Sequence, residues 1–213
     1  MALSGTWAVL PVKPFDDAKS RLQPVLDAGQ RRELARALML HSLEKLLACE
    51  RIDHVLVVSS DAEALALASR SGAAVLVESE TGLNPALTEA RAHATLNGAG
   101  NLLVVAGDLP LLDESDIDAI VTASEEADVV IAPDRLRQGT NALLLRPADA
   151  IDFRFGELSF QRHLDQAGAA GLSTIKVSRP GLAFDVDFPQ DWQDLLTTGW
   201  TGLDSLQLSQ LGL

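Results

Sequence analysis

The stretch 101–113, NLLVVAGDLPLLD, decides how the rest of the chain is interpreted. A nearly unbroken apolar run, typical of a buried strand, ends at Gly107 and Asp108, and Pro110 follows. In open α/β sheets, ligands bind outside the carboxyl ends of the strands. A carboxylate at that position is therefore either a solvated turn residue or a ligand for a bound cation.

Strand-like and helix-like segments alternate on both sides of this stretch. Strands are predicted at residues 6–12, 53–60, 73–78, 101–108, 128–133, 141–146, 173–179 and 182–188. Helices are predicted at residues 30–48, 62–70, 84–97, 115–127, 158–171 and 189–199. The alternation predicts a single α/β domain over residues 1–196, with a mostly parallel central sheet and helices on both faces. Residues 197–213 form an apolar C-terminal tail that packs on the body or on a partner chain.

Three helix starts carry recognisable capping signals. Asp61 is expected to cap the helix at 62–70, and Pro189 stands at the first position of the last helix. Ser115 and Asp118 have the spacing of a capping box.

Composition excludes several classes of protein. The chain has 213 residues, of which 47% are hydrophobic and 22% charged, as in a globular domain. No apolar run is long enough to cross a bilayer, and the N-terminus has no secretory pattern, so a cytoplasmic location without membrane association is expected. A net charge of −13 argues against a nucleic-acid surface but leaves room for a local basic pocket. The four histidines show no zinc-ligand spacing, and Cys49 is expected to be a small buried residue.

Carboxylates gather at two strand ends. Asp185 and Asp187, in the stretch FDVDF, are two residues apart, and on a strand this spacing places both side chains on one face. Mg²⁺ takes few protein carboxylates and completes its coordination with water and phosphate oxygens. Asp108 with one member of this pair would suffice for a Mg²⁺ site, and the simpler alternative is that each is a cap or turn residue.

A basic loop follows the first strand. The stretch PVKPFDDAKSRL, residues 11–22, offers Lys13, Lys19 and Arg21 where a Rossmann protein would carry its glycine-rich turn. Neither GxGxxG nor GxxxxGK[ST] occurs, which argues against dinucleotide-binding and Walker-type sites. Three cations within nine residues can neutralise a triphosphate, and the alternative is a solvated turn.

A second set of residues is suited to a separate anion. Thr140 follows Gly139, and Gly156 and Ser159 stand before a predicted helix, where free N–H groups attract anions. Taken alone, Ser159 would be an ordinary N-cap. Asn84 lies in a loop before another helix and could contact a base or ribose, although Asn-Pro is also a common turn signal.

These residues favour chemistry by positioning and charge neutralisation. The sequence shows no Ser-His-Asp arrangement and no reactive cysteine. Two anionic ligands and one metal ion instead indicate attack at phosphorus, as in nucleotidyl or phosphoryl transfer.

Several motifs occur in order between about residues 8 and 196, namely PVKPFDDAKSRL, GLNPAL, GDLPLL, APDRLRQGTNALLL, FGELSFQRH and FDVDFPQDW. This ordered set resembles one family, the 2-phospho-L-lactate guanylyltransferases (CofC and its bacterial relatives FbiD, which include phosphoenolpyruvate guanylyltransferases). The resemblance implies a MobA-like nucleotidyltransferase with a Rossmann-like fold. It also implies GMP transfer from GTP to 2-phospho-L-lactate or phosphoenolpyruvate, with 3-phosphoglycerate as a variation. Pyrophosphate would be released, and the product would feed the synthesis of coenzyme F-420.

The resemblance also implies a role for each group of residues. Asp108, Asp185 and Asp187 would bind Mg²⁺, and Thr140, Gly156 and Ser159 would hold the phosphate of the acceptor. Lys13, Lys19 and Arg21 would bind the triphosphate and, with Asp108, serve catalysis, while Asn84 would lie on the nucleotide side. The partners are then GTP and a small phospho-acid, and a homodimer is left open.

Two residues depart from the family pattern, and three alternatives stay open. Gly107 stands where relatives often have Ala, and Phe188 stands where a Thr is common, which removes a hydroxyl beside the expected metal site. The alternatives are a MobA-like enzyme with another acceptor, a non-catalytic nucleotide-binding protein of this fold, and an interaction protein that docks through its tail.

Overall fold

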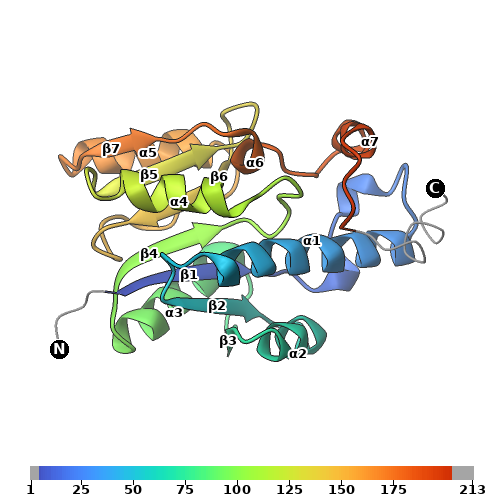
Figure 1. Ribbon diagram of the computed structural model, residues 1–213, viewed down its shortest axis with the longest axis horizontal. Helices are drawn as coiled ribbons and strands as arrows, with labels where there is room; N and C mark the ends of the chain where they lie inside the picture. Colours follow the sequence, from blue (N-terminus) through green and yellow to red (C-terminus); the bar gives the residue numbers. More distant parts are fainter. Residues whose placement is uncertain (1–4, 203–213) are drawn as a thin grey trace.

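The computed structural model describes residues 5–202, which form a seven-stranded sheet flanked by helices (Figure 1). The strands are β1 (Gly5–Pro11), β2 (His54–Ser59), β3 (Ala74–Val77), β4 (Ala99–Val105), β5 (Val129–Pro133), β6 (Thr140–Leu145) and β7 (Thr174–Lys176). The α-helices are α1 (Ala28–Ala48), α2 (Ala62–Arg70), α3 (Leu83–Leu96), α4 (Glu114–Ala123), α5 (Ser159–Ala169), α6 (Pro180–Ala183) and α7 (Pro189–Thr197). Two short 3₁₀ helices, η1 (Phe15–Asp17) and η2 (Ser20–Leu22), follow β1.

The sheet has the strand order β3-β2-β1-β4-β6-β5-β7. All pairs are parallel except the two that involve β6, which runs antiparallel to both β4 and β5. The predicted mostly parallel sheet is therefore confirmed. Because β6 is reversed, its first residue, Thr140, lies at the same edge of the sheet as the carboxyl end of β4.

Helices cover both faces of the sheet, as predicted. One apolar cluster joins the sheet to α1, α2 and α4, and a second joins the opposite face to α3 and α5. The five inner strands, β2, β1, β4, β6 and β5, are largely buried on both faces, which explains their apolar runs, whereas the edge strands β3 and β7 are partly exposed. No helix within residues 5–202 combines the length and apolarity needed to cross a bilayer.

A third apolar cluster lies beyond the carboxyl edge of the sheet. It joins η2 and the first half of α1 to the segment before α7 and to α7 itself; its members include Leu22, Leu34, Leu38, Phe184, Val186 and Trp192. Leu22 follows the basic loop and Val186 lies between Asp185 and Asp187. This cluster therefore brings two distant parts of the sequence together at one place.

Two predicted features differ from the structure. Residues 182–188, predicted as a strand, contain the end of α6 and an extended segment that pairs with no strand. Pro180 begins the short helix here, and Gly181 allows it to pack closely against residues 111–116. The capping box of α4 is formed by Asp113 and Asp116, not by Ser115 and Asp118, because the N-cap of the helix lies two residues earlier than predicted.

The close packing at Gly181 gives a prediction. A Cβ at Gly181 would overlap Asp116 Oδ2 and lie 2.5 Å from the Leu111 carbonyl oxygen, a backbone atom that cannot move easily. Gly181→Ala is therefore expected to lower the free energy of unfolding by about 1–3 kcal/mol. Urea unfolding of both proteins measures this.

Gly168→Ala is the matched control, because Gly168 lies within α5 and a Cβ there has no neighbour within 4 Å. This substitution is expected to leave stability unchanged or raise it slightly. Equal effects of the two substitutions would mean that α6 does not pack against residues 111–116 as described.

Candidate active site

The basic loop after β1 is held by the start of α2. The backbone N–H of Phe15 donates to Asp61 Oδ2 at 2.9 Å, and the Phe15 ring is buried. Asp61 also accepts from the backbone N–H of Glu63, so the predicted helix cap is confirmed and has a second role. Between η1 and η2, Lys19 adopts a left-handed backbone conformation with φ 54°. Its side chain reaches across to the carboxylates that follow β4 and α6.

Lys19 joins two of the predicted carboxylates. Its Nζ lies 2.6 Å from Asp108 Oδ2 and 3.3 Å from Asp187 Oδ1. The Lys19 side chain is only 8% exposed, against 25% for Asp108. Burial would lower the pKa of Lys19, but the negative charges of Asp108 and Asp187 outweigh burial and raise it above its usual value. Lys19 therefore keeps its positive charge at the carboxyl edge of the sheet.

Arg21 lies at the outer side of the same cluster. Its guanidinium is 2.8 Å from Asp187 Oδ2 and stacks over the ring of Phe188, 5.0 Å from the ring centroid. The family departure at Phe188 thus provides a surface for Arg21. Lys13 is exposed and makes no ion pair within residues 5–202.

Asp185 is partly buried and is the third carboxylate of this group. The segments that carry Asp185 and Asp108 are tied by a backbone bond, in which Val186 N–H donates to the Asp108 carbonyl at 3.3 Å. Asn141 donates to Asp185 Oδ1 at 3.4 Å and to the Leu182 carbonyl at 3.0 Å. Burial, together with the negative charge of Asp108 and Asp187, raises the pKa of Asp185 to about 6.

The donor set fits a magnesium ion. One ammonium group, that of Lys19, contacts both Asp108 and Asp187, and Asp185 is close enough for their negative charge to add to burial in raising its pKa. Carboxylate oxygens are the ligands that Mg²⁺ prefers. Within residues 5–202, no three acidic or histidine side chains form a ready-made metal cage. Lys19 bonds to both Asp108 and Asp187, so a divalent ion that used these carboxylates would have to displace the ammonium group.

A β-bulge shapes the second predicted cluster. Ala132 pairs with Ala142 and Pro133 pairs with Thr140, so Asn141 has no partner on β5. The bulge breaks the regular alternation of side chains. Thr140 consequently contacts α5 through His163 on one face of the sheet, whereas Asn141 contacts the Asp185 segment.

Gly156 and Ser159 lie at the start of α5, the helix that contacts Thr140 through His163. Gly156 has a φ of +115°, and the N-cap of α5 is Leu158 in a left-handed conformation, so Ser159 is the first helical residue and not the cap. The backbone N–H of Ser159 donates to the Gly156 carbonyl. Ser159 is buried, and its hydroxyl makes no hydrogen bond to another residue in the described part of the chain. It is therefore available to a ligand.

Asn84 binds the loop that leads into α5. Its Nδ2 donates to the Phe155 carbonyl at 3.1 Å, and its Oδ1 accepts from the Phe155 N–H at 2.8 Å. Asn84 also lines a surface hollow of about 300 Å³ beside Glu80 and Thr88. Its contact with a nucleotide stays a prediction, and any such contact would use the remaining hydrogen and lone pair of the amide.

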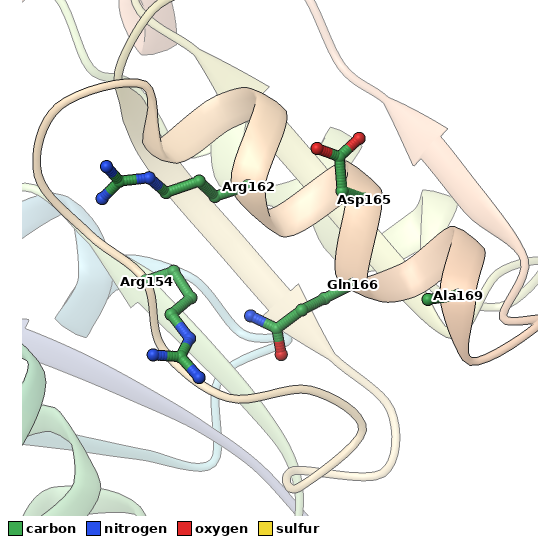
Figure 2. Close-up of a pocket in the computed structure, with 5 residues that line it drawn as sticks. All are labelled: Arg154, Arg162, Asp165, Gln166 and Ala169. Atoms are coloured by element: carbon green, nitrogen blue, oxygen red, sulfur yellow. The ribbon is translucent and has the colours of Figure 1, made fainter.

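A larger hollow, of about 500 Å³, lies along the outer side of α5 (Figure 2). Arg162, Asp165, Gln166 and Ala169 line it from the helix, and Arg154 lines it from the preceding loop. It contains none of the predicted site residues. Apart from the exposed Lys13, the predicted residues therefore gather in the cluster around Lys19 and at the contact of Thr140 with α5, with Asn84 bound to the loop before α5.

The sequence analysis did not identify two residues that contact the site, Asn141 and His163. His163 stands four residues after Ser159, a spacing that places both on one side of a helix, and this was the available signal. Asn141 adjoins Thr140, but the bulge that directs it to Asp185 gives no sequence signal.

The buried His163 gives a prediction on stability. Its imidazole is fully buried, and burial lowers its pKa to about 4. Between pH 6.5 and pH 4 the unfolded chain then binds the proton and the folded chain does not, so stability falls as pH falls. From pH 7 to pH 5 the expected loss from this residue is about 2 kcal/mol.

Urea unfolding of the wild type and of His163→Leu at both pH values isolates this contribution. The comparison with the variant is needed because the raised pKa of Asp185 acts in the opposite direction over the same range. The variant is expected to lose less stability on acidification than the wild type. Equal losses would show that His163 is protonated in the folded protein at pH 5.

Comparison with known proteins places this geometry in a family. The family model of the CofC-like guanylyl transferases matches residues 6–212. A phosphoenolpyruvate guanylyltransferase from Sphaerobacter thermophilus is 44% identical over 190 residues, which cover 89% of this chain and 92% of the relative. A 2-phospho-L-lactate guanylyltransferase from Methanothermobacter thermautotrophicus is 35% identical, with 91% of this chain and 85% of the relative covered.

Solved structures support the fold. A nucleotidyl transferase from Methanothermobacter thermautotrophicus superposes with a TM-score of 0.65 at 16% identity, covering 92% of this chain and 97% of the other. The predicted resemblance is confirmed by the family model and by the relatives. The chain belongs to the family of CofC-like guanylyl transferases.

Proposed function

We propose that this protein transfers GMP from GTP to a three-carbon phospho-acid and releases pyrophosphate, as a step in the synthesis of coenzyme F-420. The observation that carries the proposal is the junction of Lys19 with Asp108 and Asp187 at the carboxyl edge of the sheet. Cations suited to a triphosphate and carboxylates suited to a metal ion lie there in direct contact. Family membership supports guanylyl transfer over other nucleotidyl transfers.

The acceptor favoured by the relatives is phosphoenolpyruvate. The bacterial relative at 44% identity is a phosphoenolpyruvate guanylyltransferase, and the archaeal one at 35% is a 2-phospho-L-lactate guanylyltransferase. The two acceptors differ by a methyl against a methylene group and by planarity at the carbon that carries the phosphate, and a pocket discriminates such small apolar differences by only about 1–3 kcal/mol. We therefore expect phosphoenolpyruvate to be the better substrate, with measurable use of 2-phospho-L-lactate.

In the reaction, an oxygen of the acceptor phosphate forms a bond to the α-phosphorus of GTP. The bond from that phosphorus to the bridging oxygen breaks, and pyrophosphate leaves with the electron pair. Lys19 and Arg21, with the exposed Lys13, would bind the triphosphate and stabilise the charge that develops on the leaving group. Thr140, Ser159 and the backbone at Gly156 would hold the acceptor phosphate in line for attack.

A magnesium ion held by Asp108 with Asp187 or Asp185 would polarise the phosphoryl oxygens of the nucleotide when it is bound. Asp185 is partly buried, and Asn141 donates a hydrogen bond to its side chain. Lys19 would turn from the carboxylates toward the triphosphate, keeping the charge of the site balanced.

Identification of the products tests the proposal. The protein is incubated with GTP, Mg²⁺ and phosphoenolpyruvate, and the products are separated and weighed by mass spectrometry. The proposal expects a GMP-phosphoenolpyruvate diester and pyrophosphate. Formation of GDP would instead mean attack at the γ-phosphorus. Binding of GTP without any product would favour a non-catalytic nucleotide-binding protein.

A further inference from the structure

His163, fully buried in α5, contacts three residues in and around the Thr140 cluster: Thr140 itself, Arg154 and Phe155. Its Nδ1 lies 3.1 Å from Thr140 Oγ1, at the start of β6. Its Nε2 lies 3.0 Å from the backbone nitrogen of Arg154, in the loop before α5. The ring of Phe155 meets the imidazole edge-on, with centroids 5.0 Å apart. His163 is therefore hydrogen-bonded through both ring nitrogens, with no contact to solvent.

The contact with Arg154 determines where the imidazole proton lies. A backbone N–H can only donate, so His163 Nε2 must accept and cannot carry a hydrogen. Burial lowers the pKa of His163 to about 4, so the ring is neutral near pH 7. A neutral ring with a bare Nε2 has its hydrogen on Nδ1. His163 Nδ1 consequently donates to Thr140 Oγ1.

This direction determines what Thr140 can offer to a ligand. A hydroxyl has one hydrogen to donate, and the bond from His163 occupies one of its acceptor sites. Within residues 5–202 no acceptor takes the hydrogen of the Thr140 hydroxyl. The hydroxyl is therefore held as a donor, which suits a phosphate or carboxylate oxygen and opposes a ligand group that must itself donate.

We propose that His163 is a positioning residue that holds the Thr140 hydroxyl as an obligatory hydrogen-bond donor to an anionic oxygen of the acceptor. The inference rests on the proposed function in taking the Thr140 cluster as the acceptor site. It adds His163 to that site and assigns the direction of the hydrogen bond between His163 and Thr140. A role for His163 in packing alone would require neither the direction of the bond nor any coupling to Thr140.

Nuclear magnetic resonance of the histidine ring tests the direction of the bond without activity. Spectra that correlate ring protons with ring nitrogens distinguish a protonated from a bare nitrogen, and His163→Leu assigns the signals. At pH 7 we expect Nδ1 of His163 to be protonated and Nε2 to be bare. A protonated Nε2 would overturn the inference.

Two substitutions at His163 separate its two hydrogen bonds. The amide nitrogen of Asn occupies the place of Nδ1, so His163→Asn can still donate to Thr140. The amide of Gln reaches the place of Nε2, so His163→Gln keeps the loop contact and loses the donor to Thr140. We expect His163→Gln to raise the KM for phosphoenolpyruvate about tenfold, with little change in the KM for GTP. His163→Asn is expected to recover most of the affinity for phosphoenolpyruvate.

Combination with Thr140→Val completes the test. Once the hydroxyl is removed, His163→Gln is expected to cause no further rise in the KM for phosphoenolpyruvate. Additive effects, or an equal rise in the KM for GTP, would mean that His163 acts through packing. That result would overturn the inference and leave guanylyl transfer intact. A wild-type protein that neither binds nor guanylylates any phospho-acid would overturn both the proposed function and this inference.

Discussion

Replacement of Asp108 by Asn is expected to reduce turnover by on the order of 10²–10³-fold while the protein stays folded. Asp108 follows β4 at the edge of the sheet, accepts a hydrogen bond from Lys19 and is one of the carboxylates suited to a magnesium ion. The amide keeps the shape of the side chain and removes its charge. The loss should therefore appear in kcat, because charge stabilisation in the transition state is what the carboxylate and its metal supply.

Steady-state kinetics with GTP and phosphoenolpyruvate measure this effect, and thermal unfolding verifies the fold. Asp118→Asn is the matched control, because Asp118 is an exposed residue of α4 and its one ion pair within the described residues, to Arg51, spans 3.7 Å. The control should retain wild-type turnover. Wild-type turnover in Asp108→Asn would remove this residue from the catalytic site.

Replacement of Lys19 by Met is expected to lower turnover by on the order of 10²-fold or more. Met keeps the length and much of the apolar stem of the side chain but removes the ammonium group, which is the cation nearest to the carboxylate cluster. In the absence of nucleotide, Asp108 and Asp187 then face each other with no ammonium group between them. A divalent ion should therefore bind this pair more tightly in the variant than in the wild type.

Two measurements separate these effects. Turnover is measured as before, and binding of Mn²⁺ in the absence of nucleotide is measured by electron paramagnetic resonance. Lys45→Met is the control, because Lys45 pairs only with its exposed neighbour Glu44 within residues 5–202. Tighter Mn²⁺ binding together with lost turnover supports both roles of Lys19. Weaker Mn²⁺ binding would contradict the competition between the ammonium group and the metal ion.

Much of the fold could be predicted because its signals are local. Strands such as β5 are continuous apolar runs, and α2 begins at a capping aspartate and carries an apolar stripe. The prediction of a strand at 182–188 was wrong. FDVDF alternates like a strand, but Pro180 begins a short helix that the close approach of Gly181 holds in place, and the residues after it pair with no strand. The close packing of α6 against residues 111–116 depends on residues about 70 positions apart and leaves no periodic pattern.

The candidate site was predicted residue by residue, but its connections were not. The carboxylates and the basic loop could be identified because residues that follow parallel strands meet at one edge of the sheet. The bonds of Lys19 to Asp108 and Asp187 span 89 and 168 positions. Their formation depends on the left-handed conformation of Lys19 and on the apolar cluster around Leu22 and Val186. Neither the left-handed backbone of Lys19 nor this cluster can be predicted from the sequence pattern.

The position of Thr140 illustrates the same limit. Regular alternation along β6 would place its side chain on the face that Ala142 occupies, away from α5. The bulge at Asn141 turns it toward His163, and only the structure gives the direction of that hydrogen bond. Thr140 could be chosen as a candidate from its residue type and position in the sequence. The orientation of its side chain, however, depends on Asn141, which has no partner on β5.

The most direct test of guanylyl transfer is the release of pyrophosphate from GTP in the presence of Mg²⁺. The reaction is run separately with phosphoenolpyruvate, 2-phospho-L-lactate and 3-phosphoglycerate, with a parallel sample that lacks an acceptor. We predict release that depends on an acceptor and is fastest with phosphoenolpyruvate. No release with any of the three, under conditions in which GTP still binds, would contradict guanylyl transfer to a three-carbon phospho-acid.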